Sequence, residues 1–445
     1  MSKIYSARWI VPIGRPVIEE GAVVVTDATL AAVGKRADLL AAFPRLAHED
    51  FGNAAILPGL VNTHSHLELT VMRGFLEPVE HDFFAWLRKL TAARLSMSEE
   101  DLFISAAYGA QEAARAGITC LADSSSLATQ SMRALRQVGL RGIVYQESFG
   151  PDPKLAAENV AKLRGQLDAM RVLETELVRA GVSPHAPYTV SAPQLQLIAR
   201  LAIDARLPLM MHAAESAAEL QFMVHGTGPF ADGLKARGID WQPPGVSTVR
   251  YLHDHGVLQT RPLLAHCINV DENDLQLIKT AGAGIAHCPK SNAKLRHGRA
   301  PFAGFLEQQI NVGLGSDSVA SNNVCDILEE SRFAALLASD RVGAGDALIA
   351  ATQGGARALG LGDRIGQLEP GMAADLAVVN LGDWHQQPVR DPAAALIFSS
   401  SGRDVVLTVV DGKEIHRRDA GVTANESELL SRLGQVRSRL ESTAR

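Results

Sequence analysis

The sequence predicts an α/β fold: a (β/α)8 TIM barrel with a small β-sandwich domain built from both chain ends. Three observations support this prediction. From about residue 57 to residue 366, short apolar runs alternate with longer helical patterns, as in repeated β-α units. Short strand-like runs with turn residues occupy both ends of the chain. The length of 445 residues accommodates a barrel of about 250 residues and a smaller unit.

Eight short aliphatic runs are the candidate barrel strands. They are Ile56–Asn62, Ile118–Ala122, Gly142–Gln146, Val178–Val182, Leu207–Met211, Pro262–Ala265, Gly284–Ala286 and Asn311–Leu314. Helical patterns lie between them, as over Glu99–Ala116, Leu155–Leu173 and Pro193–Ala205. Eight parallel strands with crossover helices close naturally into a barrel, which we assign to residues 57–366.

The two chain ends carry the second predicted domain. Four short β-rich runs flanked by Gly, Asp or Pro are Val23–Val25, Leu30–Val33, Asp375–Val379 and Val405–Val410. Each end alone has too few strands to bury a face, so one composite domain is more economical than two separate ones. We assign this domain to residues 1–56 and 367–420. Residues 421–445 are expected to contain a terminal amphipathic helix over 426–440.

Composition indicates a soluble enzyme and argues against several other classes of protein. Hydrophobic residues make up 47% of the chain and charged residues 21%, and the net charge of -6 offers no basic surface for nucleic acid. No apolar run approaches the ~20 residues of a membrane span. A Pro and a Gly interrupt the N-terminal segment where a signal peptide needs an unbroken apolar run. The four cysteines form no C-x-x-C pair, so a cytoplasmic location is expected.

Polar and ionisable residues gather at the carboxyl ends of the predicted strands, where the active sites of such barrels lie. They follow the first, fourth, fifth, sixth and eighth predicted strands, whereas chance placement would scatter them. These residues are His64, His66, His185, His212, Glu215, His266 and Asp317.

His64 and His66 are the strongest candidates for metal ligands. Residues two apart on an extended chain project to the same side, so both imidazoles can reach one ion. The buried-strand pattern before them argues against a pair of surface histidines beside a turn. His212 ends another predicted strand and would supply a third nitrogen. Asp317 would supply an oxygen as a ligand, as a base for water or as both, the alternative being a helix N-cap.

Glu215 and His266 are the candidates for proton transfer. Glu215 lies three residues after His212, where a carboxyl group could shuttle a proton between water and substrate. The alternative is an acidic residue placed to suit a helix dipole. His266 is expected to hydrogen-bond to the attacking water, although a fourth imidazole could also bind metal.

The donor set suits zinc, one ion per subunit, with Fe²⁺ as the alternative. Zinc lowers the pKa of a bound water from about 15.7 to about 7, which would permit attack on an amidine-like carbon at neutral pH. Four further residues are candidate substrate contacts, namely His185, Arg73, Trp86 and Glu147. For Arg73 and Glu147 a salt bridge at the rim is an equal alternative. His287 and His297 could be structural.

These motifs resemble those of the amidohydrolase superfamily, in its branch of adenosine-type and cytosine-type aminohydrolases. The resemblance runs from about residue 57 to residue 381 and rests on LPGLVNTHSHLEL, SPHAPYTVS, MHAAES, LLAHC, HCPKSN and GLGSDSVASNN. It implies metal ligands at His64, His66, His212 and Asp317, with Glu215 as proton shuttle and His266 orienting water. No Lys suited to a carbamate bridge follows the fourth predicted strand, which agrees with one metal.

Within this branch, several stretches resemble aminodeoxyfutalosine deaminases, which serve menaquinone biosynthesis. They are HLEL at 66–69, FAWL at 84–87, VYQE at 144–147, GTGP at 226–229, LRHG at 295–298 and DSVASN at 317–322. The methylthioadenosine and S-adenosylhomocysteine deaminases share the core motifs, but they usually carry a Trp-Pro-x-Glu segment whose Glu binds ribose. Here Trp86-Leu87 is followed by Arg88-Lys89 with no such Glu.

The expected activity is metal-dependent hydrolytic deamination of an adenine-type nucleoside derivative resembling 6-amino-6-deoxyfutalosine, as a hydrolase of C–N bonds in cyclic amidines. The alternatives are a methylthioadenosine, S-adenosylhomocysteine or adenosine deaminase, a triazine-type hydrolase, an amidase, and a barrel that has lost catalysis. Glu215 favours deamination because departing ammonia must be protonated and chloride need not be. The complete ligand set argues against lost catalysis. The expected partner is a small-molecule substrate, with a homodimer or larger homo-oligomer as the expected assembly.

Overall fold

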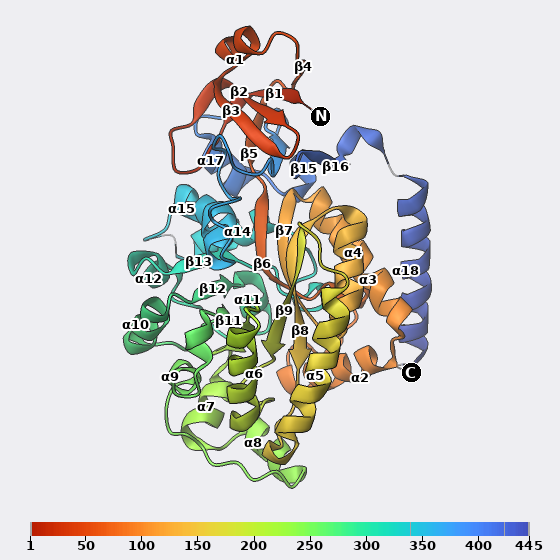
Figure 1. Ribbon diagram of the computed structural model, residues 1–445, viewed down its shortest axis with the longest axis vertical. Coiled ribbons are helices and arrows are strands. Elements are labelled where there is room, and N and C mark those ends of the chain that lie inside the picture. Colours follow the sequence, from red (N-terminus) through yellow and green to blue (C-terminus); the bar gives the residue numbers. More distant parts are fainter. Residues whose placement is uncertain (1, 339, 422, 444–445) are drawn as a thin grey trace.

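The structure is a computed structural model that describes residues 2–338, 340–421 and 423–443. Parallel strands from the middle of the chain form the body of the molecule, and a separate sheet lies beyond one end of it (Figure 1). The strands are β1 (Lys3–Ile10), β2 (Ile18–Thr26), β3 (Thr29–Lys35), β4 (Ala47–Asp50), β5 (Ala54–Pro58), β6 (Leu60–Ser65), β7 (Ile118–Ser125), β8 (Arg141–Ser148), β9 (Val178–Pro184), β10 (Met210–Ala213), β11 (Leu263–His266), β12 (Gly284–His287), β13 (Asn311–Leu314), β14 (Leu376–Asn380), β15 (Val405–Val410) and β16 (Lys413–Arg417).

The eight predicted central strands are present and parallel, but they form two sheets of four. The orders are β6-β7-β8-β9 and β10-β11-β12-β13. Single parallel bridges connect the two sheets at both seams: Val182 pairs with Leu209, and Ser65 pairs with Asp317. The prediction is therefore confirmed for the number and order of the strands, whereas the continuous ladder of a closed barrel is not present.

The first predicted strand, Ile56–Asn62, is in fact two strands. β5 ends at Pro58 in one sheet, and β6 begins at Leu60 in another. Gly59 connects the two strands. Only glycine fits at this position, because a Cβ atom there would lie 2.0 Å from the Thr119 hydroxyl. Both strands are fully buried, so the apolar run gave no sign of the boundary.

Apolar side chains fill the space enclosed by the parallel strands. A single buried cluster takes side chains from most of these strands, among them Val61, Cys120, Ile143, Tyr145, Met210, Leu263 and Ala286. Because apolar side chains fill this interior, the polar side chains lie outside it, at the carboxyl ends of the strands.

Strands from both chain ends pair in one further sheet. Its order is β16-β15-β14-β5-β1-β2-β3, with β4 paired to β1. A buried ion pair joins this sheet to the parallel strands, since Arg141 Nε at the start of β8 donates to Asp375 Oδ2 at 2.8 Å. The domain boundaries at residues 56 and 367 stay predictions.

Helices cover the outer face of the parallel strands (Figure 1). The α-helices are α1 (Arg36–Ala42), α2 (Phe83–Ser96), α3 (Glu99–Arg115), α4 (Ala128–Val138), α5 (Ala156–Arg171), α6 (Ala192–Asp204), α7 (Ala217–His225), α8 (Pro229–Ala236), α9 (Thr248–Asp254), α10 (Glu272–Ala281), α11 (Pro289–Lys294), α12 (Phe302–Glu307), α13 (Val319–Asn322), α14 (Ile327–Leu337), α15 (Ala344–Ile349), α16 (Gly355–Ala358), α17 (Pro392–Ala394) and α18 (Ala424–Thr443). Shorter helical turns are η1 (Leu67–Met72), η2 (Glu77–Val79), η3 (Pro153–Leu155), η4 (Val257–Thr260), η5 (Ala350–Gly354), η6 (Ala395–Ser399), η7 (Gly402–Asp404) and η8 (Arg418–Ala420).

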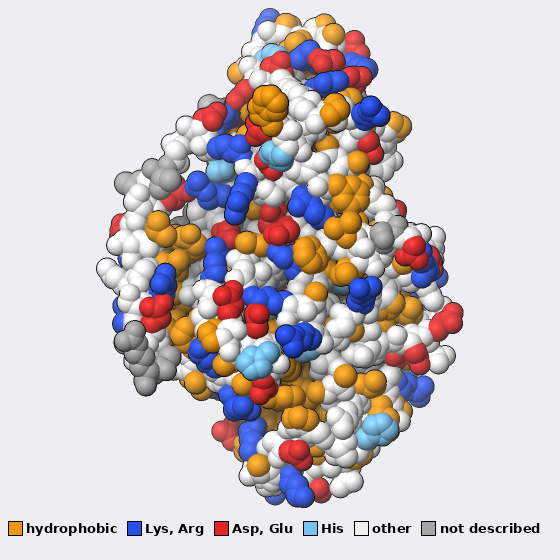
Figure 2. Space-filling model, turned by 180° about the vertical axis from the view of Figure 1, so that it is seen from behind, with side chains coloured by type: hydrophobic (Ala, Val, Ile, Leu, Met, Phe, Trp, Pro, Cys, Tyr) orange, Lys and Arg blue, Asp and Glu red, His pale blue; other side chains and the backbone are white. Residues whose placement is uncertain are grey.

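The predicted helices match observed ones to within a few residues. The predicted terminal helix at 426–440 is α18, which lies along the outside of α3 (Figure 1). Val436 and Leu440 on its apolar face are buried, and Arg115 of α3 forms an ion pair with Glu426 at 2.7 Å. Of the helices in the described ranges, none has the length and apolar character to cross a bilayer. On the face in Figure 2, basic and acidic side chains are interspersed.

Candidate active site

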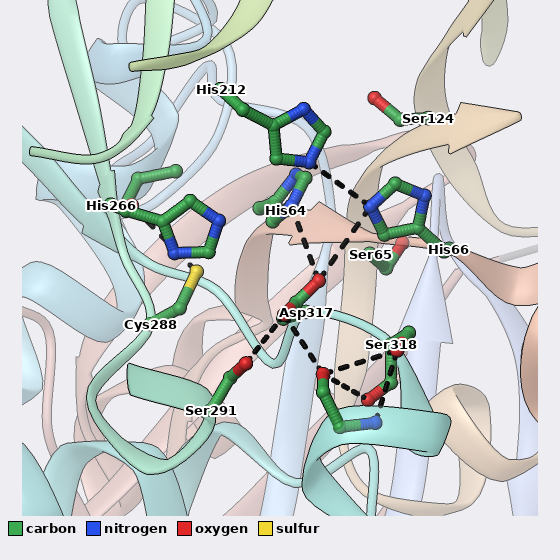
Figure 3. Close-up of polar contacts among 12 residues, drawn as sticks. His64, Ser65, His66, Ser124, His212, His266, Cys288, Ser291, Asp317 and Ser318 are labelled. Carbon is green, nitrogen blue, oxygen red and sulfur yellow. Dashed lines mark hydrogen bonds and ion pairs between the residues drawn. The ribbon is translucent and has the colours of Figure 1, made fainter. Parts of the chain in front are cut away.

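Three imidazoles and one carboxylate converge beyond the carboxyl ends of the parallel strands (Figure 3). His64 lies on β6, His66 follows that strand, and His212 lies on β10. One ring nitrogen from each lies within 4.8 Å of the others. Oδ1 of Asp317, three residues after β13, lies 3.4 Å from His64 Nε2 and 3.6 Å from His66 Nε2. The four predicted ligands therefore face one point.

The surroundings of His64 show that this group of side chains fits a metal ion. Its side chain is fully buried, and neither ring nitrogen has a hydrogen-bond partner in the described parts of the chain. Buried polar atoms without partners are costly, and an ion at Nε2 would remove that cost for this nitrogen. Gly315 permits this close packing, since a Cβ atom there would lie 2.8 Å from His64 Cβ. Imidazole nitrogens and a carboxylate oxygen are typical zinc ligands.

Neighbouring groups hold His212 and Asp317 in orientations suited to binding. The Nδ1–H of His212 donates to the His185 carbonyl at 3.0 Å, which leaves Nε2 unprotonated and 3.3 Å from His66 Nε2. Asp317 Oδ2 accepts hydrogen bonds from Ser291 at 2.5 Å and Ser321 at 2.8 Å. Its Oδ1 is therefore left for the histidines. The positive φ of Asp317, 56°, is a strained conformation of the kind found at functional sites.

A carboxylate also lies behind His66. Oε1 of Glu147, at the end of β8, is 3.8 Å from His66 Nδ1. A second group of possible metal ligands consists of Glu147, His185 and His212. Because His212 Nδ1 is used by the backbone, His212 has one free ring nitrogen and cannot serve both groups. The geometry favours one ion.

Burial sets the protonation states of the predicted ligands. It lowers the pKa of His64 to about 4 and the pKa of His212 well below its ordinary value. Both imidazoles are therefore neutral at pH 7, which is the form that binds metals. Burial opposes ionisation of Asp317, but the nearby ring of His64, 3.4 Å from Oδ1, and the rings of His266 and His66 hold its pKa well below the ordinary value. Asp317 is therefore ionised.

Glu215 lies beside the ligands, two residues after β10. Its Oε1 is 3.6 Å from the Nε2 atoms of both His266 and His297, and the Tyr188 hydroxyl donates to Oε2 at 3.5 Å. His266 Nδ1 is bound to Asn292 Oδ1 at 2.9 Å, so Nε2 points toward Glu215 and has no hydrogen-bond partner in the described ranges. This nitrogen is available to water or substrate.

A cavity of about 470 Å³ opens onto these groups. That volume is typical of small-molecule sites. Its walls are mainly apolar and aromatic, formed by Phe83, Phe84, Trp86, Leu87, Leu90, Phe149, Tyr188, Phe230, Leu234 and Leu295. Three of the predicted substrate contacts line it, namely His185, Trp86 and Glu147. The site can therefore hold a flat, largely apolar ring system against the ligand set.

Other candidates from the sequence lie elsewhere. Arg73 forms an ion pair with Glu112 and lines a separate cleft. His287 stacks on Phe302 with ring centroids 5.0 Å apart, which is a packing role. His297, by contrast, lies at the site through its contact with Glu215.

Sequence reasoning predicted Trp86 of the α2 wall, but it missed the other aromatic wall residues and the serines that hold Asp317. The walls come from α2 and α8, which are separated in sequence from the catalytic motifs. An excess of aromatic residues in Phe83–Trp86 was the available signal for α2. Ser291 and Ser321 lie inside the motifs HCPKSN and GLGSDSVASNN, but a motif does not show which hydroxyl reaches which carboxylate.

Comparisons with known proteins show which sequences this chain is similar to. The sequence profile described as Amidohydrolase family matches residues 55–415. The chain is 32% identical over 436 residues to a 5-methylthioadenosine/S-adenosylhomocysteine deaminase of Symbiobacterium thermophilum, covering 95% of each chain. It is 32% identical over 429 residues to the corresponding deaminase of Syntrophobacter fumaroxidans, covering 94% of this chain and 93% of the relative.

Solved structures agree as well. An adenosine deaminase from Xanthomonas campestris with bound zinc superposes with a TM-score of 0.85 at 28% identity, covering 99% of this chain and 98% of that one. A zinc complex of atrazine chlorohydrolase from Arthrobacter aurescens superposes with a TM-score of 0.83 at 22% identity, covering 98% and 99%. The second likeness concerns the fold alone.

Proposed function

The chain belongs to the amidohydrolase family, and from that premise we propose that it is a hydrolytic deaminase of adenine-type nucleosides. The observation that carries the proposal is the placement of Glu215 and His266 beside the ligand set, at the floor of a cavity with aromatic walls. The deaminase relatives at 32% identity support the same chemistry. The enzyme is thus a hydrolase of C–N bonds in cyclic amidines.

Four residues would hold the metal: His64, His66, His212 and Asp317. When bound there, zinc or a similar divalent ion supplies Lewis acidity that makes a water molecule a nucleophile near neutral pH. The neutral imidazoles of His64 and His212 and the ionised Asp317 suit that ion directly. Burial opposes protonation of His66, but the charges of Glu147 and Asp317 raise its pKa, so His66 would release a proton on binding the ion. The neighbouring serines keep the carboxylate in place through the reaction.

Glu215 is the proposed proton carrier. In hydrolytic deamination a proton must reach a ring nitrogen as water adds to the carbon, and a second must reach the departing amine. A single carboxyl group at the floor of the cavity can deliver both, which is typically worth about 10²–10⁴-fold in rate. His266 Nε2 lies 3.6 Å from Glu215 and has no hydrogen-bond partner among the residues that the structure describes, so it can orient the water. The aromatic walls would bind the purine face and exclude bulk water.

We further propose that Glu147, His185 and Trp86 contact the substrate. Glu147 Oε1 is buried and receives no hydrogen bond from the described part of the chain, so it could accept a hydrogen bond from a hydroxyl of the sugar. This role would compensate for the absence of a Glu after Trp86-Leu87. Because that Glu is absent, we propose 6-amino-6-deoxyfutalosine as a specific substrate, alternative to methylthioadenosine and S-adenosylhomocysteine.

The direct test is a screen for ammonia release, followed by ultraviolet absorbance as the amino group is replaced. We expect the zinc-loaded protein to deaminate at least one of adenosine, methylthioadenosine, S-adenosylhomocysteine and 6-amino-6-deoxyfutalosine. Atrazine and cytosine serve as controls, and neither should react at a comparable rate. Turnover of atrazine with no turnover of any adenine nucleoside would overturn the proposal.

A further inference from the structure

The outer part of the catalytic cavity contains a cation that the proposed chemistry does not use. Arg94 of α2 is half-buried and lines the cavity. Its guanidinium group faces an aromatic ring, with Cζ 6.0 Å from the ring centre of Phe149. Within the described ranges, no acidic side chain forms an ion pair with Arg94. A partly desolvated guanidinium facing a cavity is suited to receive an anion.

The position of Arg94 shows which part of a substrate it would meet. A series of ring contacts leads outward from the ligand set. The centroids of His212 and His185 are 4.7 Å apart, and those of His185 and Phe149 are 4.6 Å apart. Arg94 follows after Phe149. A purine with its amino group at the ligand set would therefore extend its sugar and 5′ substituent toward Arg94.

The charged side chains of the cavity also differ between its inner end, beside the ligand set, and its outer end, beside Arg94. The acidic side chains of the lining lie at the inner end. Glu147 faces His66, Glu215 faces His266 and Asp317 faces the ligands, while Glu68 is bound by Ser125 and Ser126 at the end of β7. The lining cations other than histidine are Arg94 and the exposed Arg237, which follows α8. An inner end rich in carboxylates would repel an anionic group, and the outer end would attract it.

We propose that Arg94 forms a subsite for a carboxylate on the 5′ substituent of the substrate. The inference rests on the proposed deaminase function and makes it more specific. The preferred substrates are adenine-type nucleosides with an acidic 5′ substituent, either an amino-acid carboxylate as in S-adenosylhomocysteine or an aromatic carboxylate as in 6-amino-6-deoxyfutalosine. Methylthioadenosine, whose 5′ substituent is neutral, is the matched substrate that lacks this group.

The test compares kcat/KM for these three nucleosides in the zinc-loaded enzyme and in Arg94→Gln. We expect the ratio of kcat/KM for the preferred acidic nucleoside to that for methylthioadenosine to fall about tenfold or more in the variant, chiefly through KM. Arg94→Lys should restore part of the ratio because it keeps the charge but not the planar fork. The two acidic nucleosides together show which carboxylate the subsite accepts.

The matched control is Arg88→Gln, which removes an exposed cation from the same helix outside the cavity lining. We expect this control to keep the wild-type ratio. An unchanged ratio in Arg94→Gln, or an equal fall in the control, would overturn the subsite. Deamination of methylthioadenosine by the wild type supports the proposed function whatever the ratio. If no adenine nucleoside is deaminated, the proposed function fails and the subsite fails with it.

Discussion

Replacing Glu215 with Gln is expected to lower kcat by about 10²–10⁴-fold while the protein keeps its metal. Gln has nearly the same shape but cannot carry a proton between water, ring nitrogen and amine. Glu215 is not one of the proposed metal ligands, and its Oε1 lies 3.6 Å from His266 Nε2. Ammonia release and metal content, measured on the same sample, would separate the loss of proton transfer from the loss of metal.

The control for this variant is Glu176→Gln, an equally conservative change at an exposed residue before β9. It should leave both quantities at wild-type values. Wild-type turnover in Glu215→Gln would remove Glu215 from the proposed mechanism. Loss of the metal in that variant would instead assign Glu215 a structural role at the metal site.

Replacing His64 with Ala is expected to abolish both metal binding and turnover. His64 is fully buried at the centre of the donor set, and its neighbours are packed too closely for another side chain to take its place. The variant should show metal content near zero after dialysis, against about one zinc per chain for the wild type. Ammonia release should fall to the background rate.

Thermal unfolding with and without added zinc would show whether the His64→Ala chain still folds. Zinc should raise the Tm of the wild type and leave that of the variant unchanged, since a ligand stabilises only the state that binds it. His253→Ala, at an exposed position on α9, is the matched control. An unchanged metal content in folded His64→Ala protein would contradict its assignment as a ligand.

The positions of the predicted ligands followed from the sequence because a parallel strand fixes where its next residues lie. His64 and His66 are two residues apart at one strand end, and His212 ends β10, so their convergence needed only the strand assignments. The same reasoning brought in Asp317 after β13. Local pattern and strand order were sufficient for this part of the site.

Features that depend on side-chain contacts between distant elements could not be predicted. The cavity wall from α8 forms because Phe230 stacks on Tyr188 with centroids 3.8 Å apart, and no periodicity in either segment indicates that contact. Arg73 lies close in sequence to His66, yet its side chain turns to Glu112 on α3. The sequence also did not reveal the boundary at Gly59, because buried residues on both sides of it make the two strands look like one.

The measurement that tests the central claim most directly is X-ray diffraction from zinc-loaded crystals, recorded on both sides of the zinc absorption edge. We expect one anomalous peak per chain, at about 2.0–2.2 Å from nitrogens of His64, His66 and His212 and from an oxygen of Asp317. Glu215 should lie beside that peak without bonding to it. A strong peak elsewhere, or crystals in which these four side chains bind no zinc, would contradict the assignment of the active site.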